Sequence, residues 1–359
     1  MIIPDIPRYN LASKKALAFL LKYKISALPV SPIEIIKRFG CSIRTYSFHA
    51  NKLECSVQDI CEACGSIDGY SVYDELTGKY KITYNDQISS SDRIRFTLMH
   101  ELGHIFLHHF IDFEQTKLCR GGLNNEDLEV LDKEANHFAS KVLAPEMVLL
   151  RAGWKQPETI HEKCALSTEA SKYKAAKIIE MATKRDFITN LERQVLYQFY
   201  DFIYQKSCKN CNHYFIIPGA KYCPVCGSKQ INWGRRSRMI YDKWDLDQNG
   251  KAKKCPHCEN EEIDSNFNIC KICGTNLVNK CAGKTVYYEN GYEEFQCCET
   301  IADGNARYCV NCGAETTYFQ QKLLKPWDME MQEKRAVPPI PPALIPLTNP
   351  FSNALKKSK

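Results

Sequence analysis

The segment that most constrains the fold contains five consecutive residues, His100-Glu101-Leu102-Gly103-His104. Residues four apart on an α-helix project from one face, so the two imidazoles can bind one zinc ion while Glu101 lies beside it. Cap-forming residues occupy positions 89–92, and the apolar residues of 96–106 follow helical spacing. We therefore predict a buried helix with a metallopeptidase-type site, in which His100 and His104 bind zinc and Glu101 is the catalytic base.

Two more histidines, His108 and His109, follow this segment. His108 continues the four-residue series, but two helical turns would place it about 12 Å along the axis from His100. It is therefore not expected to complete the site. We expect both residues to lie around the zinc ligands or on the surface.

A catalytic zinc ion needs a third protein ligand and an open position for water. Residues 125–143 are expected to form a second helix, because Leu131, Ala135 and Phe138 belong to one apolar stripe. Asp132 and Glu134 both flank this stripe, and periodicity does not choose between them. Either acid can also be interpreted as a solvated surface charge.

The first 206 residues read as a mainly helical domain with a small β-sheet, and the fold class as α+β. Residues 69–73 and 79–84 flank a turn and predict a hairpin, and residues 41–49 alternate like a strand. Cys61 and Cys64 fall in the expected loop between them and are left without a function. At 359 residues and 44% hydrophobic content, the chain is long enough for several domains.

The cysteine content indicates metal binding in a reducing compartment. The chain has 19 cysteines, many of them in Cys-x-x-Cys pairs, which favours zinc sites in the cytoplasm over disulfides. The start of the chain lacks the basic region of a secretory signal, and we find no apolar segment long enough to span a membrane. We therefore expect a cytoplasmic protein without a membrane partner.

The chain beyond residue 206 contains an internal repeat of paired cysteines. The first set is Cys208, Cys211, Cys223 and Cys226, and the second is Cys255, Cys258, Cys270 and Cys273. Both sets have the spacing of a zinc ribbon, predicted here for residues 207–240 and 250–278. Gly227, Gly274 and Gly313 each follow the last cysteine of a pair, where a tight turn requires a positive φ. Such short β-rich modules depend on metal for their folding.

A third, imperfect ribbon is predicted at residues 279–320. Cys309 and Cys312 form its second pair, but Glu294 stands where the first cysteine of the other pair would be. We expect a site of Cys281, Cys297, Cys309 and Cys312, in which Cys298 can replace Cys297. The alternative is a degenerate ribbon that folds without metal. The chain would then bind one catalytic and two or three structural zinc ions.

Residues 10–180 resemble the ImmA/IrrE metallopeptidase family. The resemblance rests on the segment 95–109 around the two zinc-binding histidines, on 134–145, which reads Glu-Ala-Asn-His-Phe-Ala-Ser-Lys-Val-Leu-Ala-Pro, and on Leu-Pro-Val-Ser-Pro at 28–32. It implies a zincin-like fold and Glu134 as the third zinc ligand. It also implies that the substrate is a regulatory protein of the repressor type, encoded nearby.

These observations predict a zinc endopeptidase in which Glu101 takes a proton from zinc-bound water and later protonates the leaving amine. The ribbons would position the substrate or another partner. The alternative is a regulator that binds protein or nucleic acid and whose zincin domain is a sensor without turnover. Basic residues at 221, 229, 235, 236 and 238 are interleaved with Trp233, Tyr241 and Trp244, which makes nucleic-acid binding possible. The Pro-rich residues 337–359 are expected to be disordered.

Overall fold

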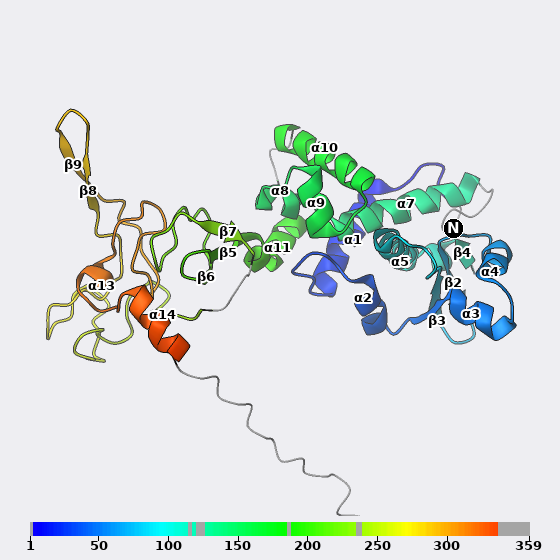
Figure 1. Cartoon of the computed structure of the whole chain (residues 1–359). Helices are drawn as coiled ribbons and strands as arrows, with labels where there is room; N and C mark the ends of the chain where they lie inside the picture. The colour runs from blue at the N-terminus through cyan, green and yellow to red at the C-terminus, as the bar shows by residue number, and fades with distance from the viewer. Residues whose placement is uncertain (1–2, 114–116, 120–125, 185–187, 235–238, 337–359) are drawn as a thin grey trace, which may run out of the picture. The chain divides into compact units, whose positions relative to one another are not determined.

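A computed structural model describes residues 3–113, 117–119, 126–184, 188–234 and 239–336. The chain divides into two compact units, Met1–Tyr204 and Gln205–Lys359, and each unit is considered by itself (Figure 1). The predicted disordered tail at 337–359 and the basic residues 235, 236 and 238 lie outside the described residues. None of the helices described has the length and apolar character needed to cross a membrane.

The first unit is mostly helical, as predicted, and contains one small sheet (Figure 1). Its described helices are α1 (Tyr9–Lys22), α2 (Pro32–Phe39), α3 (Tyr46–Leu53), α4 (Val57–Cys64), α5 (Ser91–Phe106), α6 (His109–Asp112), α7 (Glu126–Leu143), α8 (Glu146–Ala152), α9 (Pro157–Cys164), α10 (Thr168–Lys184), α11 (Asn190–Gln198) and α12 (Tyr200–Tyr204). Its described strands are β1 (Ser42–Thr45), β2 (Gly69–Asp74), β3 (Lys79–Tyr84) and β4 (Lys117–Cys119).

The sheet has the strand order β1-β3-β2-β4, and it confirms the predicted hairpin of β2 and β3. The β1 strand runs parallel to β3, while β4 pairs antiparallel with β2. Helix α5 lies close to β2. A Cβ atom added to Gly69 on β2 would lie only 2.9 Å from Cγ2 of Thr97 on α5, so a larger residue at position 69 would not fit. A strand residue that faces α5 is therefore within reach of side chains on that helix.

Two local predictions before the hairpin were wrong. The strand expected at 41–49 ends at Thr45, because the Thr45 hydroxyl caps α3 by accepting a hydrogen bond from the Phe48 amide at 3.0 Å. Cys61 and Cys64 lie on helix α4 and not in a loop. This helix begins with a reciprocal hydrogen-bond pair between Ser56 and Asp59, which satisfies backbone donors at its first turn.

Helices α5 and α7 pack directly against each other in the core. Leu102 on α5 and Ala135 and Phe138 on α7 are fully buried. Gly103 permits this close approach, since a Cβ atom there would lie 3.2 Å from both the Cα and the carbonyl oxygen of Ala135. The small residue of the zinc motif therefore sets the distance between the helix that carries the histidines and the helix that carries the acids.

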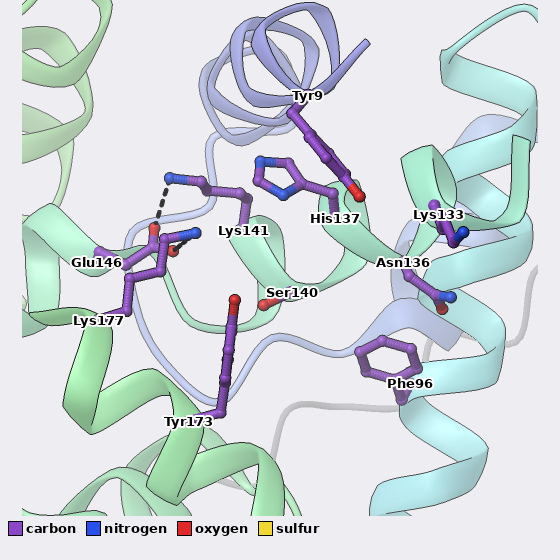
Figure 2. A pocket seen from close by; sticks show the side chains of 10 residues that line it. All are labelled: Tyr9, Phe96, Lys133, Asn136, His137, Ser140, Lys141, Glu146, Tyr173 and Lys177. Carbon is purple, nitrogen blue, oxygen red and sulfur yellow. Dashed lines mark ion pairs between the residues drawn. The ribbon is translucent and has the colours of Figure 1, made fainter. Parts of the chain in front are cut away.

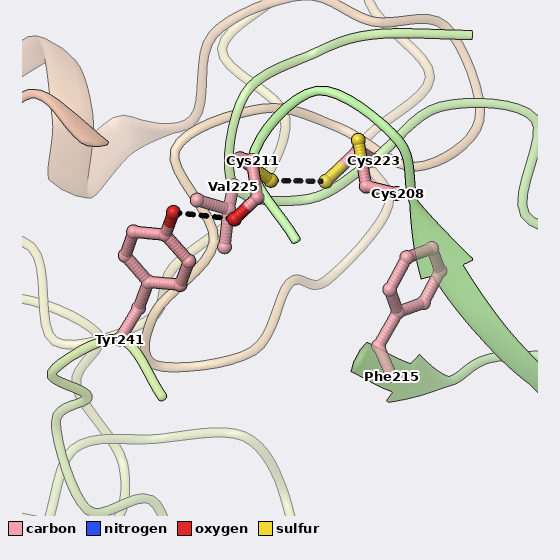
Figure 3. Packing of buried hydrophobic residues seen from close by; sticks show 6 residues of the cluster. All are labelled: Cys208, Cys211, Phe215, Cys223, Val225 and Tyr241. Atoms are coloured by element: carbon pink, nitrogen blue, oxygen red, sulfur yellow. Dashed lines mark hydrogen bonds between the residues drawn. The ribbon is translucent and has the colours of Figure 1, made fainter. Parts of the chain in front are cut away.

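The second unit consists of three small cysteine-centred modules, which we call ribbons 1, 2 and 3 in chain order. Its described elements are β5 (Gln205–Cys208), β6 (Tyr214–Ile216), β7 (Ile231–Trp233), β8 (Lys284–Tyr287), β9 (Glu293–Gln296), α13 (Thr317–Gln320) and α14 (Trp327–Ala336). The first three strands form a sheet in ribbon 1 with the order β6-β5-β7, and β8 and β9 form a hairpin in ribbon 3. In ribbon 1, the cysteines pack with Phe215, Val225 and Tyr241, and the Tyr241 hydroxyl donates to the Cys211 carbonyl at 2.7 Å (Figure 3).

Ribbons 1 and 3 pack together through equivalent turns. The amide of Lys221 donates to the Val310 carbonyl at 2.8 Å, and the amide of Arg307 donates to the Pro224 carbonyl, also at 2.8 Å. Pro224 and Val310 hold the same place in their Cys-x-x-Cys pairs, so the two contacts are reciprocal. The glycine that ends each turn faces a tyrosine ring of the other ribbon. The two turns therefore form one pseudo-symmetric unit.

Candidate zinc centres

Helix α5 brings His100 and His104 to one point, as predicted. The Ser90 hydroxyl caps the helix by accepting a hydrogen bond from the Arg93 amide at 3.3 Å. About three turns later, the Nε2 atoms of His100 and His104 lie 2.9 Å apart, and both side chains are fully buried. Burial lowers the pKa of His104 to about 3, so that the imidazole is neutral and able to bind a metal ion at neutral pH.

The third side chain at this point comes from Asp132 on α7. Its Oδ1 atom lies 3.5 Å from Nε2 of His100 and 3.3 Å from Nε2 of His104. Zinc bonds of the usual length require tetrahedral ligand atoms to be about 3.3–3.4 Å apart. The two distances from Asp132 are close to this spacing, while the 2.9 Å between the two histidine nitrogens is somewhat shorter. The three atoms form a cluster of metal-binding type among the described residues of this unit.

Glu134, which the family resemblance implied as the third ligand, is not part of this group of atoms. Residues two apart on a helix do not share a face, so Glu134 points away when Asp132 faces the histidines. The buried Glu134 carboxylate instead accepts hydrogen bonds from the Arg8 side chain, two of them at 2.9 Å, and one from His109 at 3.1 Å. Burial alone would raise the pKa of Glu134, but these hydrogen bonds lower it to about 2.

His109 connects Glu134 to the zinc ligand His104. The chain leaves α5 through His108, which has a φ of 62° and is exposed, and this turn brings His109 back toward the site. Nδ1 of His109 lies 2.8 Å from Nδ1 of His104. If Nε2 of His104 binds zinc, its Nδ1 carries the proton and donates it to His109, whose own Nε2–H then donates to Glu134. The imidazole rings of His104 and His109 thus each have only one tautomer that is compatible with these contacts.

Asn136 orients the other histidine. Its Oδ1 atom lies 2.9 Å from Nδ1 of His100, which leaves Nε2 of His100 directed at the metal position. Asn136 belongs to the same helix as Asp132, one turn later. Neither Asn136 nor Arg8 was identified from the sequence, because their contacts depend on pairing between distant segments.

Glu101 lies beside the histidines and is fully buried. The hydroxyl of Ser71 on β2 donates to its Oε2 atom. Ser71 was also missed from the sequence, although a serine on the inward-facing side of a strand is a signal that could have identified it. The predicted base is thus held by the strand that α5 approaches.

The thiolates of ribbons 1 and 2 converge as the repeat predicted. In ribbon 1, the Sγ–Sγ distance is 3.5 Å for Cys208 with Cys226. It is also 3.5 Å for Cys211 with Cys223, a contact that Figure 3 shows. In ribbon 2, they are 3.5 Å for Cys255 with Cys273 and 3.7 Å for Cys258 with Cys270. Four sulfur atoms around zinc lie about 3.8 Å apart, and all these cysteines are free thiols, so both groups fit a tetrahedral ion.

Ribbon 3 also gathers four thiols, but one of them differs from the main prediction. The group contains Cys281, Cys298, Cys309 and Cys312, so Cys298 takes the place expected for Cys297. Sγ of Cys298 lies 3.5 Å from Sγ of Cys309, whereas Cys297 turns its thiol toward the Cys281 carbonyl. The backbone gives the reason, because Glu299 has a φ of 49°. Asn212 and Glu259, which follow the second cysteine of the corresponding turns, have the same left-handed conformation.

Several of the residues proposed for nucleic-acid binding are buried or already contact other residues of the second unit. Tyr241 is 2% exposed and cannot stack on a base. Trp244 donates its indole N–H to the Leu323 carbonyl at 3.1 Å. Lys229 lies over the ring of Tyr222, 5.3 Å from its centroid. Within the described residues, these aromatic side chains serve the packing of the ribbons.

Comparisons with known proteins agree with the two-part organisation. Residues 59–177 match the Peptidase_M78 family model, described as the IrrE N-terminal-like domain, and residues 208–274 match the double zinc ribbon. No curated protein matches the chain. The second match covers ribbons 1 and 2. The chain therefore carries a metallopeptidase-type domain of the ImmA/IrrE family, followed by C-terminal zinc ribbons.

Proposed function

We propose that this protein is a zinc-dependent endopeptidase. The observation that carries the proposal is the triangle of two imidazole nitrogens and one carboxylate oxygen from His100, His104 and Asp132, with a buried Glu101 on the same helix. Two histidines and one acid are the protein ligands of a typical hydrolytic zinc site, and a neighbouring glutamate is its usual base.

Each residue has a role that follows from its position. His100, His104 and Asp132 would hold the metal, and a bound zinc ion would acidify water and polarise a peptide carbonyl. Glu101 would accept the proton from the attacking water and deliver it to the leaving amine. The Ser71 hydroxyl donates a hydrogen bond to Glu101 and would hold its carboxylate in position for this proton transfer.

The surrounding residues would fix the orientation of the ligands. Asn136 fixes the ring of His100, and His109 with Glu134 fixes the ring of His104. Such partners of metal ligands maintain both the tautomer and the basicity of the ring. Glu134 therefore supports the metal centre through His109 and not by direct coordination.

We propose a regulatory protein as the substrate, by extension from the family resemblance, and the ribbon unit as the part that binds substrate or partner. The β8–β9 hairpin of ribbon 3 supports protein binding, since Tyr287, Tyr292 and Phe295 are 76%, 60% and 65% exposed. Large exposed aromatic side chains in a group are typical of protein-interaction sites.

The second candidate function is a binding regulator that does not cleave its partner. The complete burial of the His100 and Glu101 side chains favours it, because a sensor does not need to admit a peptide. Incubation of the zinc-loaded protein with the regulator encoded beside it, analysed by mass spectrometry for new termini, separates the two. New termini that disappear with a chelator and return with zinc support the peptidase. An intact regulator that is bound but never cut supports the sensor.

A further inference from the structure

A pocket of about 640 Å³ lies in the first unit. Six of its ten lining residues belong to α5 and α7, and Figure 2 shows all ten. Phe96 precedes His100 by one helical turn on α5, and Asn136 follows Asp132 by one turn on α7. Four residues of a helix rise about 6 Å, so the near wall of the pocket begins roughly that far from the proposed metal ligands along either helix. Asn136 connects the pocket with the proposed metal position, since it lines the pocket and its Oδ1 atom also lies within hydrogen-bond distance of Nδ1 of His100.

The far part of the pocket is positively charged. Lys141 and Lys177 point into it together with the single carboxylate of Glu146 (Figure 2). Their Nζ atoms lie 3.0 Å and 3.8 Å from the Glu146 oxygens. Glu146 has a third lysine partner, the buried Lys174, at 2.9 Å. Lys174 is buried and does not line the pocket, and burial lowers its pKa, so the charge at the pocket wall comes from Lys141 and Lys177. With the Glu146 carboxylate counted, these two ammonium groups leave a net charge of about +1 at neutral pH.

Other groups that face this charge do not neutralise it. The neighbouring His137 has its pKa lowered to about 4 by burial and by Lys141 and Lys177, so it is neutral, and its Nε2 atom lies 2.8 Å from the Ser13 hydroxyl. Lys133 at the near rim pairs with the exposed Glu129 at 2.8 Å. Tyr173, which is 69% exposed, adds a phenol at the mouth. The pocket therefore presents donors and positive charge to an incoming group.

We propose that this pocket is a substrate-specificity site that binds the carboxylate of an acidic side chain in the cleaved peptide. Lys141 lies nine residues after Asp132 on α7, about 13 Å along the helix axis. An extended peptide advances about 3.3 Å per residue, so an Asp or Glu within about four residues of the cleaved bond can reach the lysines. The ammonium groups would donate charge-assisted hydrogen bonds to it. This inference rests on the proposed peptidase function.

The test uses the zinc-loaded full chain and a random peptide library, with cleavage products identified by mass spectrometry. We expect Asp or Glu to be enriched at one position within four residues of the cut. A peptide with Glu at that position should then exceed its Gln counterpart in kcat/KM by roughly 10-fold to 100-fold, the usual effect of a charged hydrogen bond.

The decisive variant is the double substitution Lys141→Gln and Lys177→Gln. Glu146 keeps its buried partner Lys174, so the fold and the zinc content should be retained. In the variant, the ratio of kcat/KM for the Glu peptide to kcat/KM for the Gln peptide should fall close to one. The matched control carries Lys163→Gln and Lys172→Gln, at two lysines of α9 and α10 that do not line the pocket. It should keep the preference for the Glu peptide. An absent preference in the wild type, or one that survives in the double variant, overturns the proposal.

A failure of the peptidase function is distinguishable from a failure of the pocket. If no library peptide is cleaved, binding of a labelled decapeptide of alternating Glu and Ala is compared with that of its Gln counterpart by fluorescence anisotropy. Tighter binding of the acidic decapeptide that is lost in the double variant supports the pocket and rejects the peptidase. Equal binding of both decapeptides rejects the pocket.

Discussion

Replacement of the two acids of α7 by alanine tests the assignment of the metal ligands. Asp132→Ala removes one of the three atoms that converge on the metal position, so the catalytic zinc ion should be lost. Glu134→Ala leaves all three atoms in place and removes the acceptor shared by His109 and Arg8. Loss of such an indirect partner typically weakens metal binding about 10-fold to 100-fold, or about 1.4–2.8 kcal/mol, without abolishing it.

The same two substitutions should have the opposite order of effect on the free energy of unfolding, with Glu134→Ala the more destabilising of the two. Glu134 is fully buried and accepts hydrogen bonds from the Arg8 backbone at 2.6 Å, from its guanidinium at 2.9 Å and from His109 at 3.1 Å. Removal of one partner of a buried ion pair costs about 3–5 kcal/mol. The Arg8 side chain is 29% exposed and can turn toward water, so we expect the lower end of that range. Asp132 is 24% exposed, and its loss should change the stability of the metal-free protein little.

Native mass spectrometry and denaturant unfolding measure both effects on the full chain. We expect four zinc ions in the wild type, three in Asp132→Ala and four in Glu134→Ala, with the last ion of Glu134→Ala most easily removed by a chelator. Glu129→Ala is the control, because Glu129 lies on the same helix, is exposed and pairs only with Lys133 in the described residues. Loss of an ion from Glu134→Ala together with its retention in Asp132→Ala would refute the assignment.

Three further predictions concern the ribbons and the helix contact. Cys298→Ser should lower the zinc count by one and Cys297→Ser should leave it unchanged, as counted by native mass spectrometry; the reverse outcome would restore the sequence-based site. Gly103→Ala should push α5 and α7 apart and destabilise the first unit by about 1–3 kcal/mol in denaturant unfolding, and an unchanged midpoint would contradict the close contact. Gly313→Ala should expose both ribbons 1 and 3 to proteolysis more than Gly274→Ala, which has a similar φ but open space around it; equal effects would argue against the paired turns.

The parts of the fold that depend on local spacing were predictable. The i, i+4 histidines, the serine cap of α5 and the β2–β3 hairpin each depend on a few neighbouring residues. The same holds for ribbons 1 and 2, whose four cysteines repeat with one spacing. Gly227, Gly274 and Gly313 have φ values of 69°, 73° and 75°, as the tight turns required.

The choice between neighbouring residues was not predictable from the same information. Asp132 and Glu134 flank the apolar stripe similarly, and only the position of Arg8, more than one hundred residues earlier, shows that Glu134 has other partners. In ribbon 3, the β8–β9 hairpin separates Cys281 from Cys298, so that counting from the second pair identified a cysteine one residue too early. Both differences from the expectation arise where contacts between distant segments decide which side chains converge.

The pairing of ribbons 1 and 3 also depends on long-range contacts. Sequence spacing and the double zinc ribbon match both connect ribbon 1 with ribbon 2. The reciprocal hydrogen bonds of Pro224 and Val310 instead join ribbon 1 to ribbon 3. The metal sites of these two ribbons are therefore expected to stabilise each other.

The most direct test of the central claim compares the zinc-loaded wild type with Glu101→Gln on the same protein substrate. Glutamine keeps the shape of the side chain but cannot accept a proton, and Glu101 is not among the three atoms of the metal cluster. We predict an unchanged zinc count and a cleavage rate lower by about 100-fold to 10,000-fold, the usual contribution of a general base. Cleavage by the variant at a near wild-type rate, with zinc retained, would contradict the account.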